Sequence, residues 1–299
     1  MFMKIKLGII GASKGNGHPY SWSAIFNGYD AQEIKDCGYP VIPNYLGEQN
    51  WPATKISSAE VVSIWTQDKH LSEHIAKSTY IPHISSSLVE LGDHVDAILL
   101  ARDDAENHLE IAKPFLLAGK PIYIDKPIAL SKVCLEELYK YEQYKGQIFT
   151  CSALRYSNSL SLPKNYKKGI GNIVSIFAST PQSWEKYAVH IIEPVLKMIP
   201  IEDSPISFER INGDDNSITL SIDWQSGIHT ELSALGLFDA DIKIQVNGTK
   251  GKKEFIFQDP FNAFKSALQD YINGILNKEC KSPFEFNLRV VSLIEAGIK

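Results

Sequence analysis

The sequence has no long hydrophobic segment. None of its uninterrupted apolar runs approaches the roughly 18 residues that a membrane-spanning helix requires. Residues 1–6 lead directly into a predicted strand, without the cleavage site of a signal peptide. These absences predict a cytoplasmic protein that does not bind membranes.

Cysteines and clusters of basic residues are also scarce. The 299 residues include 4 cysteines, which lie far apart and form no Cys-x-x-Cys pair. This spacing argues against a zinc ribbon or a disulfide framework and favours reduced, structural cysteines. The chain has 30 basic and 35 acidic residues, for a net charge of -5, and no run of lysine or arginine that would face a phosphate backbone. Nucleic acid is therefore not an expected partner.

One pair of histidines has a spacing that metal ligands can adopt. His70 and His74 are four residues apart, but the glutamate that a zincin motif places next to the first histidine is missing. The simpler interpretation is a solvated helix face, so no metal site is predicted.

The apolar part of the sequence is sufficient for about two domains, because 44% of the 299 residues are hydrophobic. In the first half, apolar strands alternate with helical segments, which predicts a doubly wound parallel α/β sheet. In the second half, period-two alternation at 218–224 and 242–246 predicts an α+β domain with an open, mostly antiparallel sheet that has helices on one side. The predicted domains are residues 1–127, with an insertion at about 28–58, and residues 128–299.

A glycine-rich turn follows the first predicted strand, residues 4–10. Such a turn, with the start of the next helix, can bind the pyrophosphate of a dinucleotide through backbone N–H groups. A strict G-x-G-x-x-G motif would have glycine at positions 13 and 16, so a structural turn without a ligand is the alternative. The residues assigned to a cofactor here are Gly11, Ser13, Gly15, Asn16, Gly17 and His18.

An acid, a lysine and a proline follow another predicted strand. Asp125, Lys126 and Pro127 stand at its carboxyl end, which is where parallel sheets bind ligands. The segment resembles the Glu-Lys-Pro element of the Gfo/Idh/MocA family, which includes glucose-fructose oxidoreductase and inositol dehydrogenase, with Asp125 in place of glutamate. His108, which begins a helical stretch ending before Gly119, belongs to the same pattern.

The resemblance implies an NAD(P)-dependent oxidoreductase with a Rossmann domain that acts on a sugar or sugar-derived substrate. In dinucleotide sites, a carboxylate at the end of the second strand binds the adenosine ribose. The family's acid falls at Thr66, and Asp68 is the nearest carboxylate. Asp68 favours NAD over NADP, although Lys69 beside it reduces that preference. Thr66 and Asp68 are therefore assigned to the cofactor site.

The loop after the strand at 96–101 departs from the family pattern. Arg102 and Asp103 stand where the family has a Thr-Pro pair, several residues before His108. An arginine at this strand end can bind a phosphate or a substrate carboxylate through two hydrogen bonds. The alternative is a local ion pair with Asp103 or Asp104. Arg102, from its place at the strand end, and His108, from the resemblance, are assigned to the cofactor site.

The resemblance implies Lys126 and His190 as catalytic residues. The family keeps an Asp-x-x-x-His segment in which the histidine acts as acid or base on a substrate hydroxyl. Lys126 would bind the same oxygen and stabilise its negative charge. The position four residues before His190 holds Lys186 instead of aspartate. Tyr187 or Glu185 takes over part of that role, or Lys186 binds an acidic substrate, or catalysis is lost.

Four residues of the second half are assigned to the substrate. Arg155 and Tyr156 resemble the Arg-Phe/Tyr pair at the start of the family's second domain, and Trp184 and Lys186 lie near His190 in sequence. The positive charges of Arg102, Arg155 and Lys186 suggest an anionic substrate. A core position is an equally good interpretation of Trp184.

Two expectations concern the whole chain. The uncovered face of the second sheet is expected to form a homodimer or homotetramer, and the final helix to return to the first domain. A competing hypothesis is a non-catalytic sensor or scaffold that kept the fold, because the altered glycine spacing, Thr66, Arg102 and Lys186 all depart from the family pattern.

Overall fold

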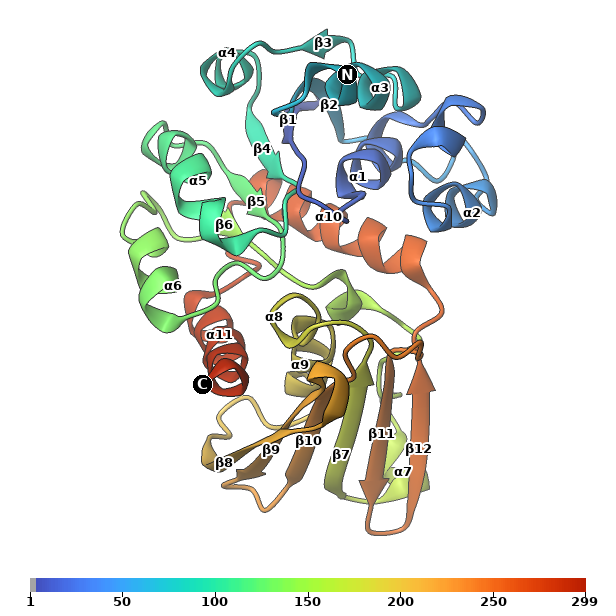
Figure 1. The fold of residues 1–299 in the computed structure, drawn as a ribbon, viewed down its shortest axis with the longest axis vertical. Helices are drawn as coiled ribbons and strands as arrows, with labels where there is room; N and C mark the ends of the chain where they lie inside the picture. The colour runs from blue at the N-terminus through green and yellow to red at the C-terminus, as the bar shows by residue number, and fades with distance from the viewer. Residues whose placement is uncertain (1–3) are drawn as a thin grey trace. The chain divides into compact units, whose positions relative to one another are not determined.

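The computed structural model describes residues 4–299 (Figure 1). The chain forms two compact units. The first comprises Met1–Ala129, Cys134–Thr150 and Phe264–Phe284, and the second comprises Leu130–Val133, Cys151–Ala263 and Glu285–Lys299. Most of helix α10 (Pro260–Asn277) thus belongs to the first unit, whereas the final helix, α11 (Phe284–Ile298), belongs to the second. The domain boundary after residue 127 stays a prediction.

The first unit is built on a sheet of six parallel strands in the order β3-β2-β1-β4-β5-β6. The strands are β1 (Ile5–Ile10), β2 (Ala59–Trp65), β3 (His83–Ile84), β4 (Ala97–Leu100), β5 (Ile122–Ile124) and β6 (Ile148–Phe149). All four residues of β4 are buried, as expected for a strand covered on both faces. This arrangement confirms the predicted doubly wound sheet. The strand order reverses between β1 and β4, and ligands of such sheets bind at that point.

Helices connect and cover these strands. They are α1 (His18–Asn27), α2 (Val41–Gly47), α3 (Lys69–Ser78), α4 (Leu88–Asp93), α5 (His108–Leu117) and α6 (Lys132–Tyr139), with short 3-10 turns η1 (Glu33–Asp36) and η2 (Ala105–Asn107). Ser87 caps the start of α4, because its hydroxyl accepts the N–H of Glu90. On the inner side of α10, the buried Tyr271 donates its hydroxyl to the carbonyl of Ile98 in β4. That bond fixes α10 to the centre of the first sheet.

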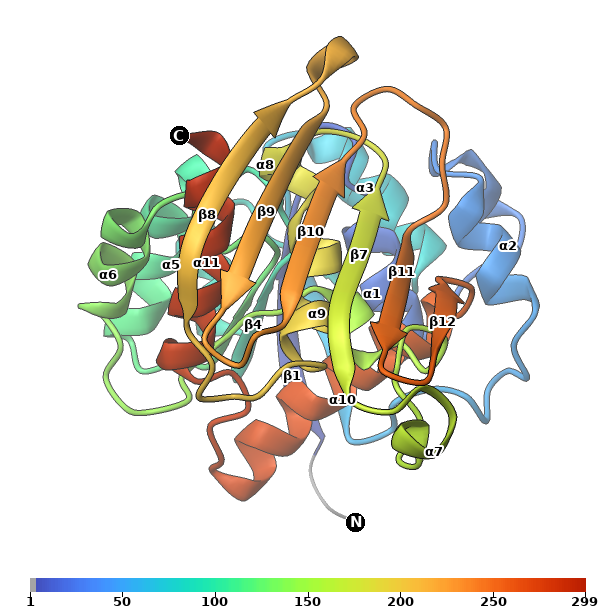
Figure 2. The ribbon, with the colours of Figure 1, turned by 90° about the horizontal axis from the view of Figure 1, so that it is seen from below.

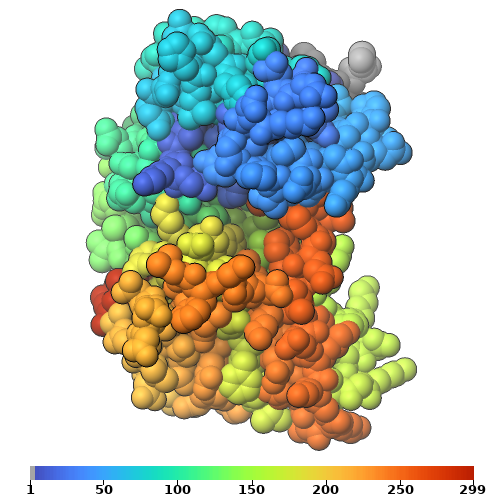
Figure 3. Space-filling view, turned by 45° about the vertical axis from the view of Figure 1, so that its right-hand side comes forward, coloured from blue at the N-terminus to red at the C-terminus, as the bar shows by residue number. Residues whose placement is uncertain are grey.

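The predicted insertion at about 28–58 folds as η1 and α2 and covers α1. A side-chain carbon at Gly17 would lie 2.6 Å from Ile42 and 2.8 Å from Tyr39, so only glycine lets the insertion pack this closely. Tyr45 stacks on Phe264 of α10 at 6.3 Å between ring centroids. Figure 3 shows this segment in blue on the surface of the first unit.

The second unit contains a six-stranded sheet in the order β12-β11-β7-β10-β9-β8, in which only the β7–β10 pair is parallel. The strands are β7 (Ile173–Thr180), β8 (Pro205–Asn212), β9 (Ile218–Trp224), β10 (His229–Ala234), β11 (Lys243–Gly248) and β12 (Gly251–Ile256). Thr249 and Lys250 form the turn between β11 and β12. The sheet confirms the predicted open, mostly antiparallel architecture.

Helices cover one face of this second sheet. Figure 2 views the sheet from its open side, with α9 (Val189–Leu196) and α11 behind it. Buried side chains of both helices pack against alternate residues of the strands, and these form one core. The remaining elements of this part of the chain are η3 (Ala153–Tyr156), α7 (Tyr166–Ile170), α8 (Trp184–Tyr187) and η4 (Asp214–Asn216).

Candidate functional site

The turn between β1 and α1 lies at the carboxyl end of β1. Gly15 has φ +85 and no atom within 4 Å of the position a side chain would take. Lys14 and Gly15 are exposed, and no described residue accepts a hydrogen bond from either backbone N–H. An exposed turn with unpaired N–H groups, a lysine and the start of a helix fits a bound pyrophosphate.

Asp103 connects this turn to Lys126. The Ser13 hydroxyl donates to Asp103 Oδ1 at 2.6 Å, and the Asp103 N–H donates back to Ser13 Oγ at 3.0 Å. The other carboxylate oxygen, Oδ2, lies 3.8 Å from Lys126 Nζ. Sequence reasoning considered Asp103 only as a partner of Arg102. The signal that could have found it is its place after β4, beside the point where the strand order reverses.

Asp125 is fully buried and binds the other side of the turn. It lies 2.6 Å from Nδ1 of His18, accepts Asn16 Nδ2 at 2.7 Å, and accepts the Lys126 N–H at 2.8 Å. Burial raises the pKa of Asp125, but the charges of His18 and Lys126 and the hydrogen bonds of His18 and Asn16 outweigh it. The net pKa is therefore below the ordinary value, and the carboxylate stays ionised while holding the backbone that carries Lys126.

Two residues assigned to the adenosine ribose are engaged at the start of α3. The Thr66 hydroxyl donates to the carbonyl of Asp68 at 2.5 Å and contacts the Ser72 hydroxyl at 2.9 Å. Asp68 caps α3, because its Oδ1 accepts the His70 N–H at 2.9 Å. Among the described residues, no group contacts Oδ2 of this exposed side chain, so Asp68 can still accept a hydrogen bond from a ligand.

Arg102 forms the local ion pair that the sequence left as an alternative. Its Nε donates to Asp104 Oδ1 at 2.9 Å, and its Nη1 donates to Gln67 Oε1 at 3.0 Å. The Gln67 side chain also bonds the backbone of Ala12: its Oε1 accepts the Ala12 N–H at 3.0 Å, and its Nε2 donates to the Ala12 carbonyl at 2.6 Å. Arg102 therefore supports the ends of β1, β2 and β4, and its role as a cofactor ligand stays a prediction.

His108 is buried at the start of α5. Its Nδ1 lies 3.1 Å from the carbonyl of Ile128, and its Nε2 lies 2.8 Å from the carbonyl of Arg102. Both ring nitrogens thus contact backbone carbonyls, one in the loop after β4 and one two residues after Lys126. His108 positions these loops, and direct contact with a cofactor stays a prediction.

His190 belongs to a separate cluster in the second unit, named here the α9 cluster: Ser152, Arg155, His190 and Glu193. His190 Nδ1 lies 2.8 Å from Ser152 Oγ, and the Ser152 N–H donates to Glu193 Oε1 at 2.8 Å. Glu193 Oε2 lies 3.4 Å from Arg155 Nε. Burial raises the pKa of Glu193 to about 7 against the opposing charge of Arg155. Sequence reasoning missed Ser152 and Glu193, although Glu193 lies one helical turn after His190.

The four residues assigned to the substrate differ in their surroundings. Trp184 is fully buried, and its indole N–H donates to the Ile294 carbonyl at 2.9 Å, so the core interpretation of Trp184 is the one observed. Arg155 is buried between the Tyr156 and Phe286 rings and paired with Glu193. Tyr156 and Lys186 are partly exposed.

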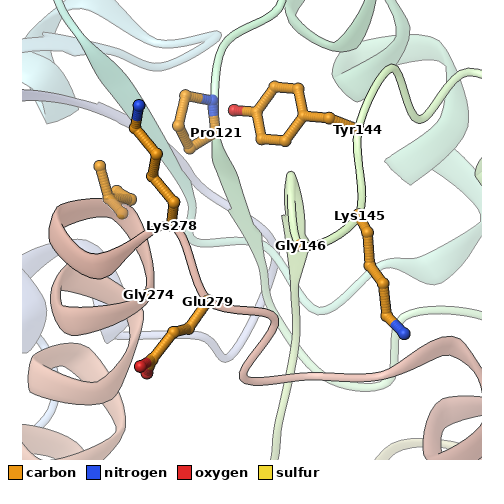
Figure 4. A pocket seen from close by; sticks show the side chains of 8 residues that line it. Pro121, Tyr144, Lys145, Gly146, Gly274, Lys278 and Glu279 are labelled. Carbon is orange, nitrogen blue, oxygen red and sulfur yellow. The ribbon is translucent and has the colours of Figure 1, made fainter.

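A separate cavity of about 440 Å³ lies at the amino end of β5, opposite the end that carries Lys126. In Figure 4, the Tyr144 phenol and the Lys278 side chain extend toward Pro121. Its lining residues are Pro121, Tyr144, Lys145, Gly146, Gly274, Ile275, Lys278 and Glu279. None of these is a predicted site residue, and ligands of parallel sheets bind at the other edge.

Residues 4–299 contain no group of three or more His, Cys, Asp and Glu side chains that could hold a metal ion. Within the same residues, no helix has both the length and the apolar character needed to cross a membrane.

Comparison with known proteins gives one family and many similar structures. Residues 5–152 match the family model GFO_IDH_MocA, described as "Oxidoreductase family, NAD-binding Rossmann fold". No curated protein matches the sequence.

Among solved structures, apo scyllo-inositol dehydrogenase from Lactobacillus casei has 17% identity and a TM-score of 0.72, over 98% of this chain and 95% of that one. Myo-inositol 2-dehydrogenase from Lactobacillus plantarum has 15% identity and a TM-score of 0.73, over 99% and 96%. UDP-N-acetylglucosamine 3-dehydrogenase from Acidithiobacillus ferrooxidans has 13% identity and a TM-score of 0.71, over the full length of both chains. At these identities the similarity shows a shared fold.

Proposed function

Since this chain belongs, through residues 5–152, to the Gfo/Idh/MocA family of NAD-binding oxidoreductases, we propose that it transfers a hydride between NAD(P) and a sugar or sugar-derived substrate. The observation that carries the proposal is the position of Lys126 at the carboxyl end of β5. Its backbone N–H donates to the buried, ionised Asp125, and its ammonium lies near Asp103, which also binds the glycine-rich turn through Ser13. Similar structures have been solved with NAD(H) and scyllo-inositol or myo-inositol, which supports this substrate class.

For the cofactor, we propose that the backbone of residues 13–17 and the start of α1 bind the pyrophosphate, and that Asp68 binds the adenosine ribose. When bound, the nicotinamide supplies or accepts the hydride. Gly11 and His18 shape the turn without offering a free group, because the Gly11 N–H donates to the Trp65 carbonyl and His18 is paired with Asp125.

For the substrate, we propose that Lys126 donates a hydrogen bond to the reacting oxygen and that His190 is the acid or base on that oxygen. Lys186 and Tyr156 are the proposed substrate contacts, because both remain partly exposed. Lys186 suits an anionic substrate. Arg155 supports the proposed substrate site indirectly, through its ion pair with Glu193.

The cofactor proposal predicts that the protein binds NADH at submillimolar concentration, and more tightly than NADPH. Titration followed by nicotinamide fluorescence measures both affinities. Asp68→Asn keeps the oxygen that caps α3 but removes the charge, so it should reduce the difference in affinity between NADH and NADPH. If neither cofactor binds, the oxidoreductase proposal is wrong; binding without turnover of any sugar would favour the non-catalytic sensor.

We also propose that the open face of the second sheet forms a homodimer or homotetramer. Phe177 is 37% exposed on this face, between Glu231 of β10 and Gln245 of β11. Burying an apolar ring at the centre of a solvated sheet face against another chain is energetically favourable.

This assembly predicts a sedimentation mass of two or four times 33.4 kDa. Phe177→Lys should shift it to the monomer, because the substitution removes the apolar ring and places a charge in the contact between chains. Val174→Lys is the matched control, since Val174 is exposed at 48% but alternation places it on the other face of β7. A wild-type monomer at micromolar concentration would contradict the assembly.

A further inference from the structure

The cavity of about 440 Å³ at the amino end of β5 lies entirely within the first unit. Its walls come from residue 121, residues 144–146 and residues 274–279. A volume of this size is in the range of small-molecule sites, and Pro121, Tyr144 and Ile275 give the cavity an apolar lining. It can therefore hold a ligand that has an apolar body.

Hydrogen bonds within each wall fix the shape of this cavity. The Gly146 N–H donates to Glu142 Oε1 at 3.1 Å, which closes the loop before β6. At the end of α10, the Glu279 N–H donates to the Gly274 carbonyl at 2.9 Å and closes the helix terminus. The cavity is thus preformed, and a ligand would not have to order its walls.

The Tyr144 ring offers the cavity a flat apolar surface. Its side chain is 46% exposed, and its hydroxyl donates to the Gly119 carbonyl at 3.3 Å, which holds the phenol in place. Aromatic rings stack favourably on such a surface, so the lining suits an aromatic ligand.

Lys278 lines the same cavity in an uncommon backbone conformation. It follows the last residue of α10 with φ +55, in the left-handed region where glycine is the usual residue at a helix end. A lysine is thus present here against the preference of the backbone. In Figure 4 its side chain extends toward Pro121, whereas those of Lys145 and Glu279 extend away from it.

The positive charge of Lys278 is not balanced by an acid. Among residues 4–299, no carboxylate lies within ion-pair distance of its ammonium, and no group accepts a hydrogen bond from it. The neighbouring carboxylate, Glu279, is paired with Lys281, whose Nζ lies 2.6 Å from its Oε2. A free ammonium beside an apolar cavity is complementary to an anion with an apolar body.

We propose that this cavity binds a small aromatic carboxylate, with its ring against Tyr144 and Ile275 and its charged group on the Lys278 ammonium. The site is separate from the proposed cofactor site, because the glycine-rich turn and Lys126 lie at the carboxyl ends of the strands. The proposal does not depend on the oxidoreductase activity.

Isothermal titration calorimetry with naphthoate, an aromatic carboxylate, tests this proposal without cofactor or substrate. We expect submillimolar binding, and binding about tenfold weaker for naphthylmethanol, which has the same rings but no charge. Failure of naphthoate to bind, or equal affinities for the two compounds, would overturn the proposal.

Variants of the cavity show whether naphthoate binds there. Lys278→Gly removes the ammonium and relieves the left-handed backbone, so affinity should fall about tenfold without a lower midpoint of thermal unfolding. Ile275→Trp keeps Lys278 but fills the cavity, and should abolish binding. Unchanged affinity in either variant would overturn the proposal.

Tyr80→Gly is the matched control for Lys278→Gly. Tyr80 also follows the end of a helix, α3, with φ +55, and it is exposed. It precedes β3, at the opposite edge of the first sheet from β5 and β6. Tyr80→Gly therefore relieves the same backbone conformation far from the cavity, and its affinity for naphthoate should equal that of wild type. An equal fall in affinity in Tyr80→Gly and Lys278→Gly would contradict a role for the Lys278 ammonium.

Discussion

Lys126→Met is expected to lower kcat by about 10²–10³-fold, the cost of removing one donor aimed at a developing negative charge. Methionine keeps the length and the apolar part of the side chain but removes the ammonium. Because Lys126 is buried, its charge acts where water screens it little. The measurement is the initial rate of NAD(P)H oxidation with the best available keto-sugar, at saturating cofactor.

The substitution should leave the surrounding structure in place. Asp103 would lose the ammonium 3.8 Å away but keep the hydroxyl of Ser13. Asp125 would keep His18 and the backbone N–H at position 126. Cofactor affinity should therefore change little, which separates a chemical defect from a binding defect.

Lys120→Met is the matched control for this prediction. Lys120 precedes the amino end of the same strand, β5, and its Nζ donates to the Val95 carbonyl at 2.8 Å. Loss of that surface bond should leave kcat within a factor of two of wild type, because ligands bind at the other end of the strand. Equal rates in Lys126→Met and wild type would remove Lys126 from the mechanism.

Gly297→Ala is expected to destabilise the second unit by about 1–3 kcal/mol, the usual cost of forcing an extra carbon into a packed core. The added Cβ would fall within 3.0 Å of the Trp184 ring, closer than real side chains approach. The ring cannot move away easily, because Trp184 is fully buried and its indole N–H is bound to the carbonyl of Ile294, one turn earlier in α11.

Urea unfolding followed by tryptophan fluorescence measures this change, and Gly47→Ala is its control. Gly47 ends α2 and has no atom within 4 Å of the side-chain position, so alanine there should be neutral or stabilise by up to about 1 kcal/mol. A similar loss of stability in both variants would show that the contact with Trp184 does not set the effect.

Local patterns in the sequence were sufficient for the architecture and for the position of Lys126. Apolar runs and period-two alternation act over a few neighbours, so they predicted the parallel sheet and the open sheet. The Asp-Lys-Pro segment could be placed at a strand end for the same reason. These features need no knowledge of which strands become neighbours.

The partners of the predicted site residues were decided by the tertiary structure. Ser13 and Asp103 are 90 residues apart, and they meet because β1 and β4 are adjacent in the sheet. Ser152 and His190 meet because η3 packs beside α9, which no spacing in the sequence indicates. The sequence offered Arg102 an ion pair with Asp103 or with Asp104, and the structure shows the pair with Asp104. Hydrogen bonds depend on distances of a few tenths of an ångström between side chains far apart in sequence, and folding alone sets those distances.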